Sequence, residues 1–204
     1  MEIELKYSID KFKADKIFAD EYIKKIMDDD SEEFIQMEAV YFDTEDRRLN
    51  RDRIALRIRK EGNITVATLK WNGSSEEGLY KREEINIPVS ADSINSPTIE
   101  LFSQSPMYDE LYKLIGDRPL VEMMRMSFVR HQVRVDTGKA ICEISVDEGS
   151  VKCAGKESPI LELEIELYSG SSDALEKLGA EIADKYQLVP ENRSKFKRGL
   201  DLML

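Results

Sequence analysis

The chain has 204 residues, 41% of them hydrophobic and 35% charged, and this composition is typical of a folded globular protein with a substantial core. The formal net charge of −11 at pH 7 disfavours nonspecific binding of nucleic acid, which needs a basic surface. No run of about 18 apolar residues predicts a membrane span, and the N-terminus carries acids where a signal peptide would be basic and then apolar.

Cysteine and histidine are scarce. Cys142 and Cys153 are too few for a disulfide framework and lack metal-ligand spacing, and the single histidine, His131, disfavours a histidine-rich zinc site. We therefore expect reduced thiols and a cytoplasmic protein, with neither nucleic acid nor membrane as a partner.

The first seven residues alternate between polar and apolar side chains, which predicts a β-strand with two unlike faces. Its polar face carries Glu2, Glu4 and Lys6. One such strand fits an exposed edge as well as the wall of a polar cavity. The same construction recurs along the chain with charges of both signs, and this recurrence favours the cavity.

The rest of the first half predicts one helix and four strands. Apolar residues at helical spacing from 10 to about 27 predict a single helix with Asp10 as its N-cap. Strands are expected over 34–42, 54–60, 64–71 and 80–88, with a hairpin turn at Gly62-Asn63 and a loop over 72–75.

The second half repeats the order of strands and helices. A short helix over 107–115, closed by Gly116, marks the boundary between two halves, 1–105 and 106–204, within one domain spanning 1–204. Strands follow over 120–136, 139–148 and 160–168, with a loop over 149–159, then a helix from Ser171 to about 186. The basic segment 195–198 lies near the end of the chain, in a stretch that we read as strand-like.

Eight strands with few helices predict an α+β protein that is mainly β, built on a closed eight-stranded antiparallel β-barrel with flanking helices. Closure removes exposed strand edges. Because the polar strand faces carry so many opposite charges, we expect a polar lumen, a tunnel, with the apolar faces turned outward under the helices. The charged residues expected in the lumen are Glu2, Glu4, Glu84, Glu143, Asp147, Glu162, Glu164, Glu166, Lys6, Arg57, Arg59, Lys70, Arg82, Arg125 and Lys195.

This combination of charges suits a chelated polyphosphate. Guanidinium and ammonium groups bind phosphate oxygens, and carboxylates without histidine or thiolate form an oxygen site for Mg²⁺ or Mn²⁺. Neither set of charges would be stable in isolation, because unpaired buried charge is costly. A simpler alternative is that the charged faces are the solvated sides of ordinary strands. Whether Glu166, Arg130, Arg134 and Lys197 line the ligand-binding site is left open.

The motif Glu2-x-Glu4-x-Lys6 resembles the N-terminal signature of the CYTH superfamily, the triphosphate tunnel metalloenzymes. Further motifs that are similar to those of the family follow in order over nearly the whole chain. They are Tyr41-Phe42-Asp43-Thr44, Leu56-Arg57-Ile58-Arg59, Thr68-Leu69-Lys70, Arg82-Glu83-Glu84, the acidic strands 143–147 and 162–166, and Ser194-Lys195. The sequence departs from the family pattern at Met123-Met124, where relatives often carry polar or basic residues, and this leaves the register of Arg125 in doubt.

The resemblance implies a tunnel that binds a triphosphate and one or two divalent cations. Phosphate would be bound by Lys6, Arg57, Arg59, Lys70, Arg125 and Lys195, joined by Arg82 from the lumen set. The metal, Mg²⁺ or Mn²⁺, would be bound by Glu2, Glu4, Asp147, Glu162 and Glu164. The catalytic set would be Glu2, Glu4, Lys6, Glu84 and Lys195.

The family implied by this resemblance contains several activities. We expect a metal-dependent triphosphatase acting on inorganic triphosphate, with some activity on nucleoside triphosphates. Class IV adenylate cyclase and thiamine triphosphatase are the alternatives within the family, and a non-catalytic polyphosphate-binding or sensing module is the alternative of another class. The expected partner is a small triphosphate, and the sequence leaves the oligomeric state open, a homodimer included.

Overall fold

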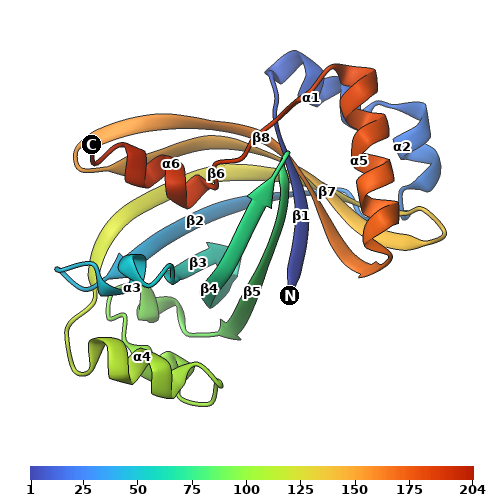
Figure 1. Ribbon diagram of the computed structural model, residues 1–204. Helices are drawn as coiled ribbons and strands as arrows, with labels where there is room; N and C mark the ends of the chain where they lie inside the picture. Colours follow the sequence, from blue (N-terminus) through green and yellow to red (C-terminus); the bar gives the residue numbers. More distant parts are fainter.

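Eight antiparallel strands close into a barrel in the computed structural model, which describes residues 1–204 (Figure 1). The strands are hydrogen-bonded in the order β5-β4-β3-β2-β6-β7-β8-β1, and β1 also pairs with β5. This closure confirms the predicted barrel. A ninth strand of two residues, β9, pairs with the end of β1.

The strands are β1 (Glu2–Ser8), β2 (Glu33–Asp43), β3 (Ala55–Glu61), β4 (Ile64–Glu76), β5 (Leu79–Pro88), β6 (Val121–Asp136), β7 (Ala140–Cys153), β8 (Lys156–Gly170) and β9 (Val189–Pro190). The α-helices are α1 (Lys11–Phe18), α2 (Glu21–Ile26), α3 (Arg48–Arg51), α4 (Tyr108–Ile115), α5 (Ser172–Tyr186) and α6 (Lys195–Asp201), and two 3₁₀ helices cover Ala91–Ile94 and Ile99–Phe102. None of the helices is both long and apolar enough to cross a membrane.

Two apolar cores lie on the outer face of the barrel. The larger packs α1, α2 and α5 against β1, β6, β7 and β8, and the other packs α4 and the second 3₁₀ helix against β2, β3 and β4. Helix α5 approaches β1 closely at Gly179, where an added Cβ would lie 2.2 Å from Cδ1 of Leu5. This contact fixes the strand that carries Glu2, Glu4 and Lys6.

A third apolar core lies partly inside the barrel, and it was not predicted. Met37, Ala39, Met126 and Phe128 belong to it, and Phe196 of α6 packs against it. The expectation that all apolar faces turn outward therefore holds for only two of the three cores. Helix α6 brings its own apolar side to one end of the lumen, and the inward faces of β2 and β6 are apolar where they meet it.

Several local predictions need correction. The predicted helix over 10–27 is two helices, because the side chain of Asp20 accepts a hydrogen bond from the backbone N of Tyr22 and caps a new helix. Residues 72–75 continue β4 through a bulge. The predicted loop 149–159 is instead a hairpin between β7 and β8, turning at Ala154 and Gly155, which both have positive φ. Residues 195–198 form helix α6, capped by Ser194, not a strand.

Candidate active site in the barrel lumen

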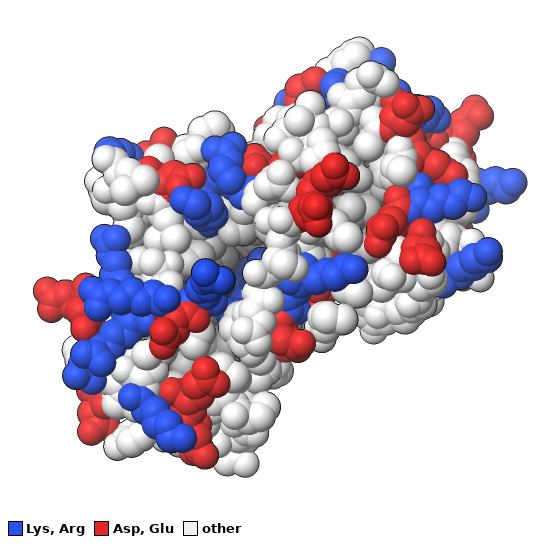
Figure 2. Space-filling model, in the orientation of Figure 1, with Lys and Arg blue, Asp and Glu red and all other residues white.

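A cavity of about 510 Å³ occupies the lumen next to α6. Figure 2 shows basic side chains gathered around a hollow in this face of the molecule. The predicted site residues that line the cavity are Glu2, Glu4, Lys6, Arg57, Arg59, Lys70, Arg82, Glu84, Glu164 and Lys195. Side chains alternate between the two faces of a strand, and the site residues on β1, β3, β4, β5 and β8 occupy the positions that face the lumen. Lys195 enters the cavity from α6.

Lys195 lies at the centre of a buried acidic cluster. Its Nζ is 2.6 Å from Oδ2 of Asp147 and 2.8 Å from Oε1 of Glu164, and it also pairs with Glu162. Burial disfavours ionisation of Glu164, but Lys195, Lys6 and Arg130 outweigh burial and hold its pKa well below the usual range. Asp147 and Glu162 are fully buried beneath Lys195 and do not line the cavity.

The predicted phosphate ligand Arg125 lies outside the cavity. Its side chain is 49% exposed and pairs with Glu122 on the outer face of β6. The inward row of β6 includes Met126, Phe128 and Arg130, which line the cavity and occupy even-numbered positions, whereas Arg125 occupies an odd-numbered one. The cation that β6 contributes to the lumen is therefore Arg130, whose position the sequence left open.

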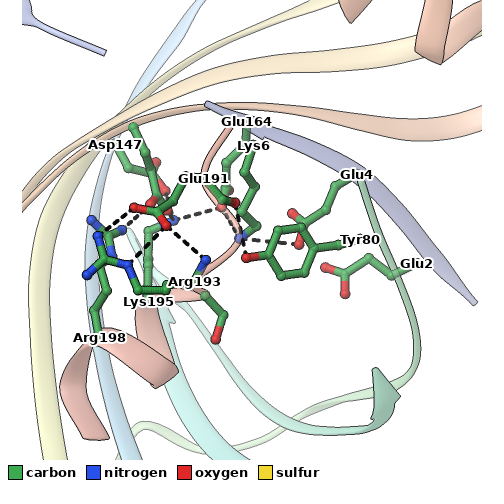
Figure 3. A network of polar contacts seen from close by, with 12 residues as sticks. Glu2, Glu4, Lys6, Tyr80, Asp147, Glu164, Glu191, Arg193, Lys195 and Arg198 are labelled. Atoms are coloured by element: carbon green, nitrogen blue, oxygen red, sulfur yellow. Dashed lines mark hydrogen bonds and ion pairs between the residues drawn. The ribbon is translucent and has the colours of Figure 1, made fainter. Parts of the chain in front are cut away.

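A second network links the acids of β1 to the cations of β4 and β5. Arg82 donates hydrogen bonds to both Glu2 and Glu4, and Nζ of Lys70 lies 2.9 Å from Oε1 of Glu2. Nζ of Lys6 lies 3.3 Å from Oε1 of Glu4 and 2.5 Å from Oε1 of Glu164, and thus joins this network to the cluster around Lys195 (Figure 3). Burial and the attraction of Lys70 act in opposite directions on Glu2, and the cations prevail and lower its pKa.

Arg57 is a buried lumen cation without a carboxylate partner. It is 8% exposed and forms no ion pair; its Nη2 donates only a 3.4 Å hydrogen bond to Thr68, and its Nε has no partner. The neighbouring phenol of Tyr41 responds to the surplus positive charge. Burial disfavours ionisation of Tyr41, yet Arg57, with Lys70 behind it, outweighs burial and lowers its pKa. This part of the cavity therefore presents a guanidinium without a carboxylate partner, which suits an anion.

Glu166 lines the cavity without an ion-pair partner. One carboxylate oxygen from each of Glu166, Glu2 and Glu4 lies within 4.8 Å of the other two, close enough to ligate one metal ion. Burial, followed by repulsion from Glu2 and Glu4, raises the pKa of Glu166 to about 7. This cluster therefore has negative charge that a cation would neutralise. In the other cluster, Asp147, Glu162 and Glu164 all pair with Lys195, so none of its carboxylates is without a cation as Glu166 is, and this cluster fits a metal less well.

Sequence reasoning missed some site residues. Arg198, one turn after Lys195 on α6, pairs with Glu162 and so supports the acidic cluster from behind. Arg53 and Trp71 line the cavity as well, and so does Lys197, whose position the sequence left open. Helical spacing between Lys195 and Arg198 could have predicted that both side chains reach the same cluster. The interpretation of 195–198 as strand-like excluded that prediction.

Residues 1–200 match the model of the CYTH domain. An inorganic triphosphatase of Haemophilus influenzae is 28% identical over 159 residues, which are 78% of this chain and 44% of that protein, so the chain spans less than half of the length of this relative. A Hippeastrum protein whose structure is described as revealing a dominant triphosphatase activity superposes with a TM-score of 0.76 at 20% identity, covering 100% of this chain and 97% of the other. A Pyrococcus horikoshii protein superposes with a TM-score of 0.62 at 22% identity, covering 99% of each chain. These structural likenesses establish the shared fold.

Proposed function

Because the chain belongs to the CYTH domain family, we propose that it hydrolyses inorganic triphosphate in the barrel lumen with Mg²⁺ or Mn²⁺ as cofactor. The observation that carries this proposal is Arg57, a buried cation without a carboxylate partner that faces the cavity beside a phenol of lowered pKa. An unpaired buried charge is costly, and an anionic ligand would neutralise it. The name of the Haemophilus influenzae relative supports triphosphate as that anion.

The cations of the lumen would bind phosphate in two ways. Arg57, Arg59 and Arg82 offer planar guanidinium groups for bidentate contacts with phosphate oxygens, and Lys6 and Lys70 act as point charges. They would stabilise the charge that spreads over the transferred phosphoryl group and the leaving pyrophosphate. Lys195, which is paired with carboxylates, would mainly position α6 and add positive charge to the lining of the cavity.

The cofactor would be held by Glu2, Glu4 and Glu166, whose oxygens cluster without histidine or thiolate, as Mg²⁺ and Mn²⁺ prefer. A divalent cation bound there would supply a Lewis acid that neutralises charge on the phosphate. Glu84 lines the same cavity, pairs with Lys70 and stands apart from this cluster. We assign to its carboxylate the orientation of the attacking water.

A second candidate substrate class is an organic triphosphate. Trp71, Phe128 and Phe196 give the cavity an aromatic part beside its cations, and aromatic side chains accommodate the organic group of thiamine triphosphate or a nucleotide. The lumen cations would contact the phosphates of either substrate class. The choice between the two classes therefore depends on measurement of the products.

One assay decides among these activities. Purified protein is incubated with inorganic triphosphate, thiamine triphosphate or ATP, with Mg²⁺, Mn²⁺ or EDTA, and all products are identified. We expect metal-dependent phosphate release that is fastest from inorganic triphosphate and greatly reduced in Glu4→Gln, Arg57→Ala and Lys195→Ala, with Arg125→Ala as the control on the outer face. Tight triphosphate binding without turnover under any divalent cation would instead indicate a sensor, and cyclic AMP with pyrophosphate from ATP would indicate a cyclase.

A further inference from the structure

The lumen continues past the candidate active site into a second cavity of about 200 Å³. The inward rows of the strands run from one cavity to the other. On β2 the row passes from Ala39 in the first cavity to Met37 and Ile35 in the second, and on β8 it passes from Glu164 to Tyr168. The second cavity is therefore the opposite end of the same tunnel, which we call the far cavity.

Three residues, Arg59, Arg130 and Glu166, line both cavities and form the partition between them. Glu166 is also a member of the carboxylate cluster with Glu2 and Glu4. Glu2 and Glu4 line only the first cavity, so the cluster extends from the partition into that cavity. The cations Arg57 and Lys195 line only the first cavity.

The two ends of the tunnel carry opposite charge. The first cavity is lined by nine basic and five acidic side chains. The far cavity is lined by three acidic side chains, Glu61, Glu143 and Glu166, and by the two arginines of the partition. Glu61 pairs with Arg59, and Glu143 lies 3.8 Å from Arg130, so the acidic excess of this cavity is one charge. Since charge lining a narrow opening concentrates ions of opposite sign and raises their rate of arrival, the ends favour different ions.

We propose that the divalent cation reaches the Glu2–Glu4–Glu166 cluster through the far cavity, past Glu61 and Glu143, whereas triphosphate enters by the basic end. The inference rests on the proposed function for its ligands, and it adds a separate route for each. A cation can then bind or leave while the substrate fills the first cavity. Gln132, on the inward row of β6, lies on the cation route.

The route can be measured without catalysis. Trp71 is the only tryptophan and lines the first cavity, so the quenching of its fluorescence by paramagnetic Mn²⁺ reports the arrival of the ion. Metal-free protein is mixed with Mn²⁺ in a stopped-flow instrument, alone and after loading with substoichiometric triphosphate. Loss of the electron paramagnetic resonance signal of free Mn²⁺ gives the same rates independently of Trp71.

Two matched variants each add one lysine to β6, on opposite faces of the strand. Gln132→Lys adds a cation to the far cavity, and Val129→Lys adds one to the exposed outer face of the same strand. We expect Gln132→Lys to slow Mn²⁺ arrival and release about tenfold, with or without triphosphate, and to change the equilibrium affinity less than either rate. Glu143→Gln should slow arrival as well, compared with Glu148→Gln on the exposed part of the same strand.

Equal Mn²⁺ arrival rates in Gln132→Lys and Val129→Lys would overturn the proposal. So would faster arrival in Arg53→Gln, which removes a cation from the basic end, combined with no effect of Gln132→Lys. These outcomes are separate from the proposed function. A protein that takes up Mn²⁺ through the far cavity but releases no phosphate would overturn only the triphosphatase assignment.

Discussion

Arg130 binds Asp147 through two parallel hydrogen bonds, from Nε to Oδ1 and from Nη2 to Oδ2, each 2.8 Å long. Nη2 of the same guanidinium donates a third bond of 2.6 Å to Glu164. These contacts join β6 to β7 and β8 inside the barrel, where Asp147 is fully buried. Burial disfavours ionisation of Asp147, but Arg130 and Lys195 outweigh it and lower the pKa of the carboxyl group.

Removal of Arg130 should therefore destabilise the protein strongly. We expect Arg130→Ala to lower the free energy of unfolding by about 3–5 kcal/mol, because it leaves Asp147 charged and buried without its main partner. Arg125→Ala, on the outer face of the same strand, should change it by less than about 1 kcal/mol, as for other exposed ion pairs. Urea unfolding of the two variants measures the contrast. Similar losses in both would show that the lumen contacts of Arg130 do not stabilise the fold.

Replacement of Lys195 should change how stability depends on pH. In the wild type the pKa of Glu164 is held below its unfolded value, so its contribution to stability is present above the unfolded pKa and is lost as pH falls. In Lys195→Met, burial and mutual repulsion of the carboxylates should raise their pKa values, so that the folded state binds more protons than the unfolded chain. Stability of the variant should then fall more steeply than that of the wild type from pH 5 to pH 8. Parallel curves from urea unfolding without metal would contradict this expectation.

In metal-free protein, Glu166 should contribute separately to the pH dependence of the free energy of unfolding. Its folded pKa of about 7 lies above the unfolded value, so the group contributes stability that is present at low pH and is lost as pH rises towards 7. Each unit of difference is worth about 1.4 kcal/mol. Glu166→Gln should flatten the decline in unfolding free energy between pH 5 and pH 8. Glu157→Gln, an exposed change on the same strand, provides the control and should leave the decline unchanged.

Replacement of Arg57 should weaken triphosphate binding without lowering the stability of the fold. Because it has no carboxylate partner, Arg57→Gln leaves no buried acid unpaired, and we expect the free energy of unfolding to change by less than about 1 kcal/mol or to rise. Triphosphate affinity should fall about 10- to 100-fold, since a charged hydrogen bond to the ligand is worth about 1.5–3 kcal/mol. Titration calorimetry in metal-free buffer measures the affinity. Unchanged affinity would remove Arg57 from the phosphate site, whatever the stability of the variant.

The sequence by itself determined the strands and the faces of most of them. Alternation along β1, β3, β4 and β5 was regular enough to place Glu4, Arg57, Lys70 and Arg82 in one lumen, because inward and outward positions follow directly from a period of two. It was also sufficient to predict closure of the barrel. The Gly62-Asn63 turn was equally local, since a two-residue hairpin depends on the turn residues alone.

Only the tertiary structure decided which cations and acids meet. On β6 both Arg125 and Arg130 occupy a strand, and only the pairing of that strand with β2 and β7 shows which parity faces inward. Lys195 reaches Asp147 and Glu164 because α6 docks on the apolar inner core, which joins residues far apart in the chain. That docking places an ammonium in one carboxylate cluster and leaves Glu166 of the other without a cation. Such a difference depends on distances across a closed barrel, and no local pattern in the chain encodes them.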